Sequence, residues 1–129
     1  MQIEQILRET RTIAVVGLSD NPRKASFGVA KYLMAHYEVI PVNPNHSEVL
    51  GLKCYPDLRA VPGPVDMVDL FQRSESVLPF VQPSIDIGVK CFWMQLNIRH
   101  AQARLQLEAA GISVIDDKCT QVEHLRYLR

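Results

Sequence analysis

The residues best suited to bind a ligand lie in a polar loop that follows an apolar run near the N-terminus. The run of residues 13–16 ends at Gly17, and the stretch after it carries hydroxyl and basic side chains, among them Ser19, Arg23, Lys24 and Ser26. Glycine allows the backbone to turn sharply where a strand ends. A helix that begins just after such a turn directs free N–H groups and the positive end of its dipole at one place. The loop of residues 17–26 therefore predicts a phosphate site, and an ordinary turn that binds nothing is the alternative.

Groups suited to catalysis are present, but they do not form a recognisable catalytic set. Asp66 and Asp69 stand in an apolar run, where carboxylates typically hydrogen-bond to loops or helix N-termini. Asp116 and Asp117 are expected to be solvent-exposed residues at the end of a strand. The chain has four histidines, which are His36, His46, His100 and His124. Their spacing does not match a metal site, and they do not occur in the patterns that accompany a nucleophilic serine or cysteine. We therefore expect no enzymatic activity from this chain.

Composition and charge exclude several classes of function. The chain has 14 basic and 14 acidic residues, so it lacks the positive charge expected for nucleic acid or anionic membranes. No apolar run approaches the roughly 20 residues of a membrane span, and residues 1–7 do not resemble a signal peptide. The three cysteines, Cys54, Cys91 and Cys119, lie far apart in the sequence. This scattered arrangement is typical of reduced thiols. We expect one cytoplasmic domain over residues 1–129 that binds a small molecule.

Strand and helix patterns alternate along the chain. Apolar runs predict strands at residues 12–17, 38–43, 65–71, 89–94 and 112–115. Helical periodicity predicts helices at residues 1–11, 26–37, 74–88, 98–110 and 120–127, with Ser26 as an N-cap and Gly111 just past a helix end. Pro83 is expected to kink or divide the helix of residues 74–88. Such alternation is typical of α/β domains. We expect a Rossmann-like, doubly wound parallel sheet of about five strands in a single three-layer domain.

In this fold a ligand binds at the carboxyl ends of the strands, beside the first strand. A dinucleotide is the obvious candidate, but the G-x-G-x-x-G pattern is missing, since the next glycine after Gly17 is Gly28. The second strand ends in Val42, Asn43 and Pro44 without the acid that usually binds the adenosine ribose. A neutral turn tolerates a phosphorylated ribose. Coenzyme A and NADP both carry one.

Several motifs in order resemble the small stand-alone CoA-binding proteins, which are similar to the N-terminal CoA-binding domain of the succinyl-CoA synthetase alpha subunit. These motifs are IAVVGLS, VIPVNP, VLGLKCYP, VDMVDLF, FWMQL and IDDKC, and they extend over about residues 10–120. Family members often have Tyr-Arg where this chain has Phe27-Gly28, and Gly where it has Asn97. Arg23 and Lys24 are expected to replace the missing cation, and asparagine tolerates left-handed backbone angles.

The resemblance implies that CoA lies across the strand ends. Its pyrophosphate would lie on the loop of residues 17–26 and its adenosine beside residues 42–44. The pantetheine arm would extend toward Phe71, Arg73, Trp93 and Gln95. Trp93 could instead be a core residue, and Cys119 either a small buried residue or a thiol that reacts with that of CoA.

Two functions of different class follow from these observations. One is a module that binds CoA or an acyl-CoA without catalysis, as a carrier, a sensor or the partner of another protein or of a second copy. The other is a small NADP-dependent oxidoreductase. The missing dinucleotide glycines and the absence of a placed proton donor favour the first.

Overall fold

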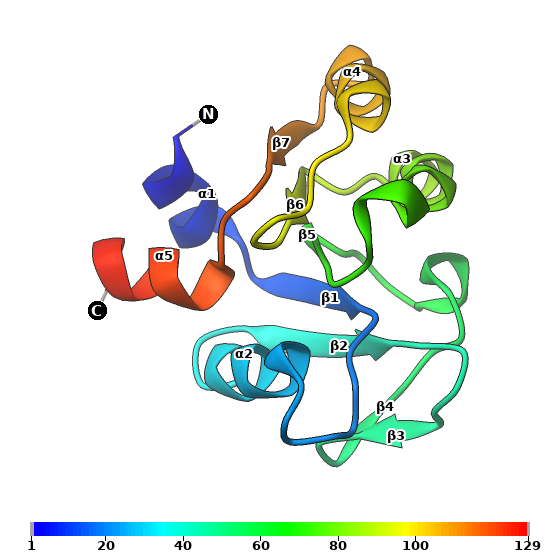
Figure 1. Cartoon of the computed structure of the whole chain (residues 1–129), viewed down its shortest axis with the longest axis vertical. Helices are drawn as coiled ribbons and strands as arrows, with labels where there is room; N and C mark the ends of the chain where they lie inside the picture. Colours follow the sequence, from blue (N-terminus) through cyan, green and yellow to red (C-terminus); the bar gives the residue numbers. More distant parts are fainter. Residues whose placement is uncertain (1, 129) are drawn as a thin grey trace.

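The computed structural model describes residues 2–128 and shows the predicted parallel α/β fold (Figure 1). Five strands form one sheet in the order β2-β1-β5-β6-β7, with every neighbouring pair parallel. Their bounds are Thr12–Val16 (β1), Glu38–Val42 (β2), Met67–Leu70 (β5), Cys91–Met94 (β6) and Ser113–Ile115 (β7). A separate antiparallel hairpin, Glu48–Val49 (β3) and Leu52–Lys53 (β4), follows β2. The prediction of a doubly wound parallel sheet is confirmed.

Helices cover both faces of the sheet. Ile3–Glu9 (α1), Ala25–Leu33 (α2) and Thr120–Tyr127 (α5) lie on one side of it, and Val81–Ile87 (α3) and Ala101–Ala109 (α4) lie on the other (Figure 1). Successive residues of a strand face opposite layers. Thus Ile13 and Val15 pack with α1 and α2, whereas Ala14 and Val16 pack with the α3 and α4 side. Burial on both faces explains why the strands read as continuous apolar runs.

The strand order places the reversal of winding between β1 and β5. The chain leaves β1 through α2 to reach β2 at the sheet edge, and it then crosses back to form β5 on the other side of β1. The carboxyl ends of β1 and β5 therefore border the crevice in which this fold binds ligands. Gly17 follows β1 and Phe71 follows β5, which places both residues at that crevice.

The largest departure from the sequence prediction lies in residues 74–88. A helix kinked or divided at Pro83 was expected there, but the chain forms two 3-10 turns, Ser74–Ser76 and Leu78–Phe80, before α3 begins at Val81. Proline has no N–H and disfavours a helical conformation in the residue before it. Pro79 lies in the second turn and Pro83 in the first turn of α3, where a missing N–H is tolerated.

Other boundaries differ by a few residues. The predicted helix 98–110 begins at Ala101 because the His100 side chain accepts a hydrogen bond from the Ala103 N–H and caps it. Gly111 follows this helix with φ of +83°, and Asn97 has φ of +67°, as predicted for both turns. Within residues 2–128, no helix combines the length and apolar character needed to cross a membrane.

Candidate functional site

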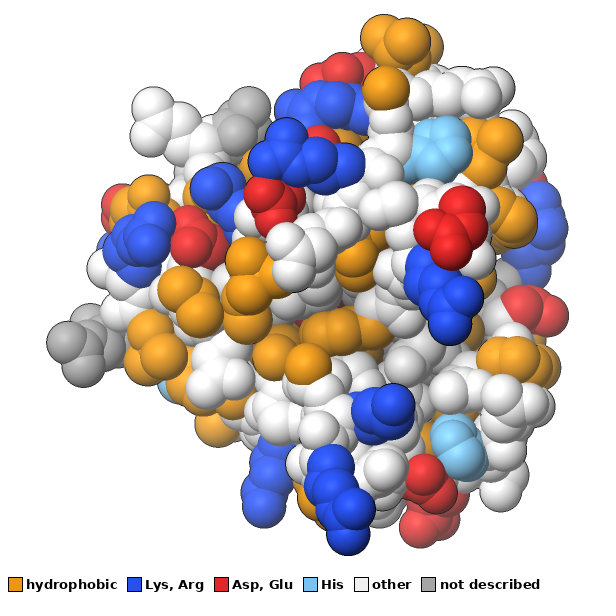
Figure 2. Space-filling view, viewed as in Figure 1, with side chains coloured by type: hydrophobic (Ala, Val, Ile, Leu, Met, Phe, Trp, Pro, Cys, Tyr) orange, Lys and Arg blue, Asp and Glu red, His pale blue; other side chains and the backbone are white. Residues whose placement is uncertain are grey.

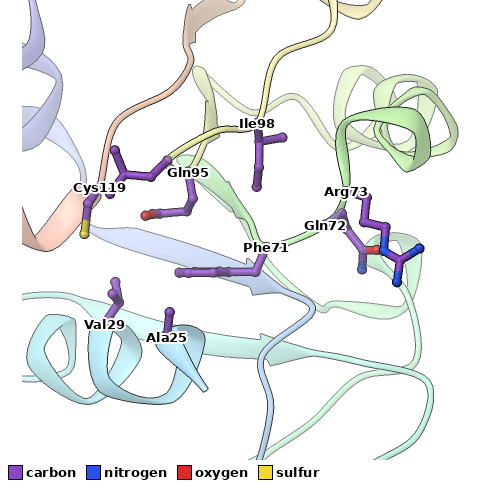
Figure 3. A pocket seen from close by; sticks show the side chains of 9 residues that line it. Ala25, Val29, Phe71, Gln72, Arg73, Gln95, Ile98 and Cys119 are labelled. Atoms are coloured by element: carbon purple, nitrogen blue, oxygen red, sulfur yellow. The ribbon is translucent and has the colours of Figure 1, made fainter. Parts of the chain in front are cut away.

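Two cavities open at the carboxyl ends of the strands. The first, of about 430 Å³, lies between α2 and the ends of β5 and β6, and Val29, Phe71, Gln95 and Ile98 are among its walls (Figure 3). The second, of about 380 Å³, lies between the ends of β1 and β2 and the segment before α3. Phe71 and Gln72 line both cavities. The two cavities are therefore adjacent halves of one candidate site.

Gly17 lines the second cavity beside Phe71, and the fold itself requires a glycine at this position. It has φ of +82°, and a Cβ atom at this position would lie 2.2 Å from the carbonyl oxygen of Phe71. Its N–H donates to the Val42 carbonyl at 2.9 Å. Gly17 was predicted to be part of a phosphate loop. The structure shows that contact between the ends of β1 and β5 already requires glycine.

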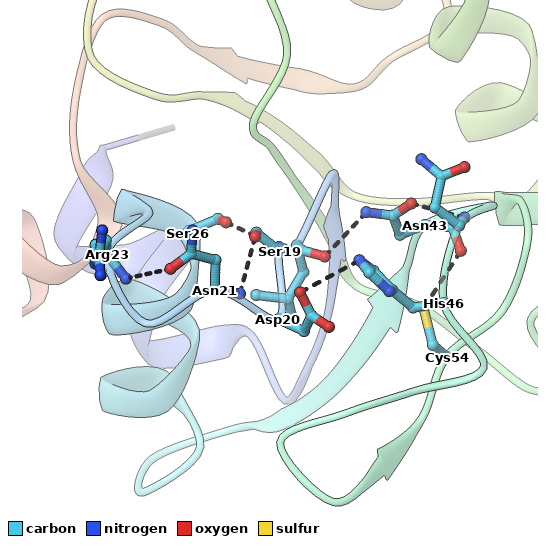
Figure 4. A network of polar contacts seen from close by, with 10 residues as sticks. Ser19, Asp20, Asn21, Arg23, Ser26, Asn43, His46 and Cys54 are labelled. Carbon is cyan, nitrogen blue, oxygen red and sulfur yellow. Dashed lines mark hydrogen bonds and ion pairs between the residues drawn. The ribbon is translucent and has the colours of Figure 1, made fainter.

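The loop from Gly17 to Ser26 is tied together by its own side chains (Figure 4). The Ser19 N–H donates to the Ser26 hydroxyl oxygen at 3.0 Å, and the Asn21 N–H donates to the Ser19 hydroxyl oxygen at 3.0 Å. Ser26 is not the predicted N-cap, because α2 begins one residue earlier and Lys24 holds the cap position without a side-chain bond. Ser26 is buried, and its hydroxyl oxygen accepts the Ser19 N–H that closes the loop onto the first turn of α2.

The turn after β2 is held against this loop. The Asn43 side chain donates to the Leu18 carbonyl at 3.1 Å and accepts from the Asn45 N–H at 2.9 Å. The His46 imidazole lies 3.7 Å from the Asp20 carboxylate (Figure 4). Asn43 therefore has a structural role in this turn. Asn45 is exposed and also lines the second cavity, which leaves its side chain open to solvent or ligand.

The cations near the site have no acidic partner within residues 2–128. Arg23 and Lys24 are exposed on the β1–α2 loop, and Arg73 is exposed at the first cavity. None of them forms an ion pair with a described residue, whereas Arg8, Arg59, Arg99 and Arg104 do. In Figure 2, basic side chains lie beside this loop, below a hollow whose floor is hydrophobic. The arrangement suits a ligand with phosphates at one part and an apolar chain at another.

A buried polar network lies beneath the first cavity. The Asp69 carboxylate is fully buried and accepts hydrogen bonds from Gln95 Nε2 at 2.5 Å and from the Thr120 hydroxyl at 2.9 Å. Burial raises the pKa of Asp69 to about 7, and the bonds from Gln95 and Thr120 oppose that rise. The network fixes the Gln95 amide at the wall of the cavity. The expectation that the carboxylates are structural fits Asp69 and also Asp66, which accepts from the Arg11 and Thr12 N–H groups.

The sequence allowed two roles for Trp93, as a core residue or as a wall of the ligand site, and the structure shows that it is a core residue. Its side chain is fully buried, packs in the core on the α1–α2–α5 side, and donates from its indole to the Lys118 carbonyl at 2.7 Å. Along β6, Trp93 and Cys91 face the same layer, while Phe92 and Met94 face the other. No surface of Trp93 is available to a ligand in this conformation.

The remaining predicted residues divide between the two cavities and the loop. Gly17, Val42, Asn43 and Pro44 line the second cavity, and Phe71, Arg73 and Gln95 line the first. Ser19, Arg23, Lys24 and Ser26 belong to the loop between β1 and α2. Ligand contact by these residues stays a prediction. The sequence did not identify Val29 and Ile98 as cavity walls.

Asp116 and Asp117 are more than the solvated strand end expected of them. Asp117 is bonded to the Arg99 guanidinium at 2.6 Å and accepts from the Asn97 N–H at 2.7 Å, and these partners lower its pKa. Asp116 accepts from Arg104 at 3.2 Å. Both carboxylates thus anchor the segment after β7 to the loop after β6 and to α4.

The sequence comparisons give a consistent result. Residues 11–125 match the family model described as the CoA binding domain. The uncharacterized protein YneT of Bacillus subtilis (strain 168) is 39% identical over 124 residues, which are 95% of this chain and 92% of YneT. The alpha subunit of the ADP-forming acetate–CoA ligase II of Pyrococcus furiosus is 41% identical over 59 residues. That match spans 44% of this chain and only 13% of the ligase subunit.

Solved structures agree with these matches. A hypothetical protein of Pyrococcus horikoshii OT3 superimposes with a TM-score of 0.96 at 38% identity, over 98% of this chain and 90% of that one. The dinucleotide-forming acetyl-coenzyme A synthetase 1 of Candidatus Korarchaeum cryptofilum gives a TM-score of 0.74 at 26% identity. This second match covers 87% of this chain and 27% of the synthetase. The family resemblance predicted from the motifs is confirmed, and the chain belongs to the CoA binding domain family.

Proposed function

We propose that this protein binds coenzyme A or an acyl-CoA across the two cavities, and that it has no catalytic machinery for turning over an acyl group. The observation that carries the proposal is the pair of cavities that meet at Phe71 and Gln72, at the switch point of a chain that matches the CoA binding domain over residues 11–125. CoA has a nucleotide half and a flexible arm of comparable length. Two adjacent cavities suit such a ligand.

The second cavity suits the nucleotide half. Pro44, Leu58 and Phe80 supply apolar walls for a base. The turn after β2 carries no acid, and the nearby carboxylate of Asp57 already accepts from the Ala60 N–H at 2.9 Å. A 3′-phosphate placed at the turn itself would therefore meet the amides of Asn43 and Asn45, whereas Asp57 lines the same cavity from the segment after β4. The pyrophosphate would lie next to the loop of residues 17–26, near Arg23, Lys24 and the N-terminus of α2.

The first cavity suits the pantetheine arm. Val29, Phe71 and Ile98 give it apolar walls, and Gln95 supplies a polar group at the far end. Mostly apolar walls with a few placed polar groups are typical of small-molecule sites. A binding site of this kind is sufficient for a carrier, a sensor or the CoA-binding partner of another protein. NADP, the other candidate ligand, has a second nucleoside in place of the arm.

CoA is expected to raise the melting temperature, because a ligand that binds only the folded state stabilises it by mass action. At a concentration one hundred times its dissociation constant, the shift should be on the order of 10 °C. NAD at the same concentration should give a shift close to zero. Differential scanning fluorimetry measures both values, and an equal or larger shift with NAD would count against the proposal.

Asn45→Asp should weaken CoA binding by about tenfold, because a carboxylate near the 3′-phosphate adds like-charge repulsion that solvent only partly screens. Asn43 is unsuitable for this test because its amide holds the turn together. Isothermal titration calorimetry with CoA and with dephospho-CoA, which lacks only the 3′-phosphate, measures the effect.

Asn45→Ala is the matched control, since it removes the same side chain without adding charge. It should bind both ligands nearly as the wild type does. If Asn45→Asp weakens the two ligands equally, the 3′-phosphate does not lie at this turn.

A further inference from the structure

One of the three cysteines differs from the others in its surroundings. Cys54 and Cys91 are buried, and burial raises the pKa of both thiols, that of Cys91 to about 12. Cys119 is partly exposed and lines the first cavity, beside the N-terminus of α5. Reactive cysteines are accessible, whereas buried ones in apolar surroundings are inert. Cys119 is therefore the thiol that a small molecule in the cavity can reach.

A second feature of the same cavity points to a ligand. The Gln95 side chain is 5% exposed, and its Nε2 is engaged by Asp69 and Thr120. Its oxygen accepts no hydrogen bond from any residue in the range 2–128, and Figure 3 shows that oxygen at the cavity on the same side as the Cys119 sulfur. No buried side-chain oxygen or nitrogen within residues 2–128 lacks a hydrogen-bond partner, so this oxygen is an unpaired acceptor that opens into the cavity. An amide N–H or a thiol at the end of a ligand arm would supply one.

We propose that Cys119 is a thiol–disulfide exchange site for CoA, in which the protein becomes joined to the terminal sulfur of the bound molecule. The inference rests on the proposed function, because it requires the arm of CoA to lie in the first cavity. Gln95 would hold the end of the arm beside the thiol, and Asp69 and Thr120 would orient Gln95.

The reaction needs a disulfide of CoA as the second reactant. The Cys119 thiolate attacks one sulfur of the symmetrical disulfide of CoA, a bond forms between the two sulfurs, and the original S–S bond breaks. The departing CoA leaves as a thiolate and takes up a proton. The Cys119 sulfur is oxidised and the departing sulfur is reduced, so the electrons balance. A dithiol reductant reverses the step.

Intact-protein mass spectrometry after incubation with CoA disulfide tests the proposal. One CoA per chain should be added, peptide mapping should place it on Cys119, and dithiothreitol should remove it. Oxidised glutathione has the same reactive bond but no nucleotide, so it should react at least about tenfold more slowly at equal concentration. Adenosine 3′,5′-bisphosphate should slow the CoA reaction by competing for the second cavity.

Variants locate the reacting sulfur. Cys119→Ser and Cys119→Ala should give no adduct, whereas Cys54→Ser, a matched change at a buried cysteine, should give the wild-type adduct. Equal rates with CoA disulfide and oxidised glutathione would show an ordinary exposed thiol and overturn the proposal. So would an adduct that survives in both Cys119 variants.

Calorimetry with reduced CoA, run on the same preparation, separates the two proposals. If reduced CoA binds but its disulfide gives no adduct at Cys119, the exchange site is wrong and CoA binding stands. If reduced CoA does not bind, the proposed function is wrong, and the exchange site falls with it.

Discussion

Replacing Gly17 by alanine is expected to destabilise the protein by at least about 3 kcal/mol. A non-glycine residue in the left-handed region costs roughly 1–2 kcal/mol, and Gly17 has φ of +82°. The new Cβ would also lie 2.2 Å from the Phe71 carbonyl oxygen, so the end of β5 would have to move away from β1. Moving packed backbone at the centre of a sheet adds to the conformational cost.

Gly28→Ala is the matched control, because Gly28 lies inside α2 and a Cβ there would meet no atom within 4 Å. Alanine is the better helix former by about 1 kcal/mol, so this variant should be slightly more stable than the wild type. Urea denaturation measures both changes. A Gly17→Ala variant as stable as the wild type would show that the β1–β5 contact does not depend on glycine.

The second large effect concerns the buried carboxylate of Asp69. The pKa of Asp69 is about 7 in the folded protein, against 3.8 for the unperturbed side chain. Between these values the folded state binds a proton that the unfolded state has lost, so stability falls as the pH rises. Relative to an Asp69→Asn variant, the wild type should lose about 2–3 kcal/mol of unfolding free energy between pH 5 and pH 8.

The comparison with Asp69→Asn is needed because another group titrates in the same range. Burial and the nearby His36 lower the pKa of His124, so its contribution makes stability rise with pH up to about 6.5 and opposes that of Asp69. Asp86 and Asp117 have lowered pKa values, so they change the pH dependence of stability only in more acidic solution. Subtracting the variant's urea-derived stability at each pH isolates Asp69. A difference that stays constant from pH 5 to pH 8 would show that Asp69 is ionised throughout.

The sequence predicted the sheet well because its strands are buried on both faces. Residues 13–16 are a continuous apolar run for that reason, residues 67–70 are apolar apart from Asp69, and their positions in the sheet agree with the prediction. The region around Pro79 and Pro83 was predicted poorly. A helical pattern of apolar residues does not distinguish one helix from two 3-10 turns followed by a shorter helix, and the prolines only indicated that a break was expected.

The candidate site was predicted at the level of strand ends but not of side-chain directions. The strand-end rule selected Phe71 and Gln95 correctly as neighbours of a cavity. It could not show that Trp93, two residues before Gln95, turns fully into the core. It also could not show that Asn43 is occupied within its own turn, because that depends on the distance to the Leu18 carbonyl. Such assignments need the packing of elements that are distant in sequence.

Isothermal titration calorimetry with CoA and NADP is the sharpest test of whether the two cavities together bind CoA. Both ligands carry an adenosine, a pyrophosphate and a ribose phosphate, but only CoA has an arm that would extend into the first cavity. We expect one CoA per chain and binding of NADP that is at least about tenfold weaker, a difference of about 1.4 kcal/mol. Binding of NADP that is as tight as that of CoA, or tighter, would contradict it.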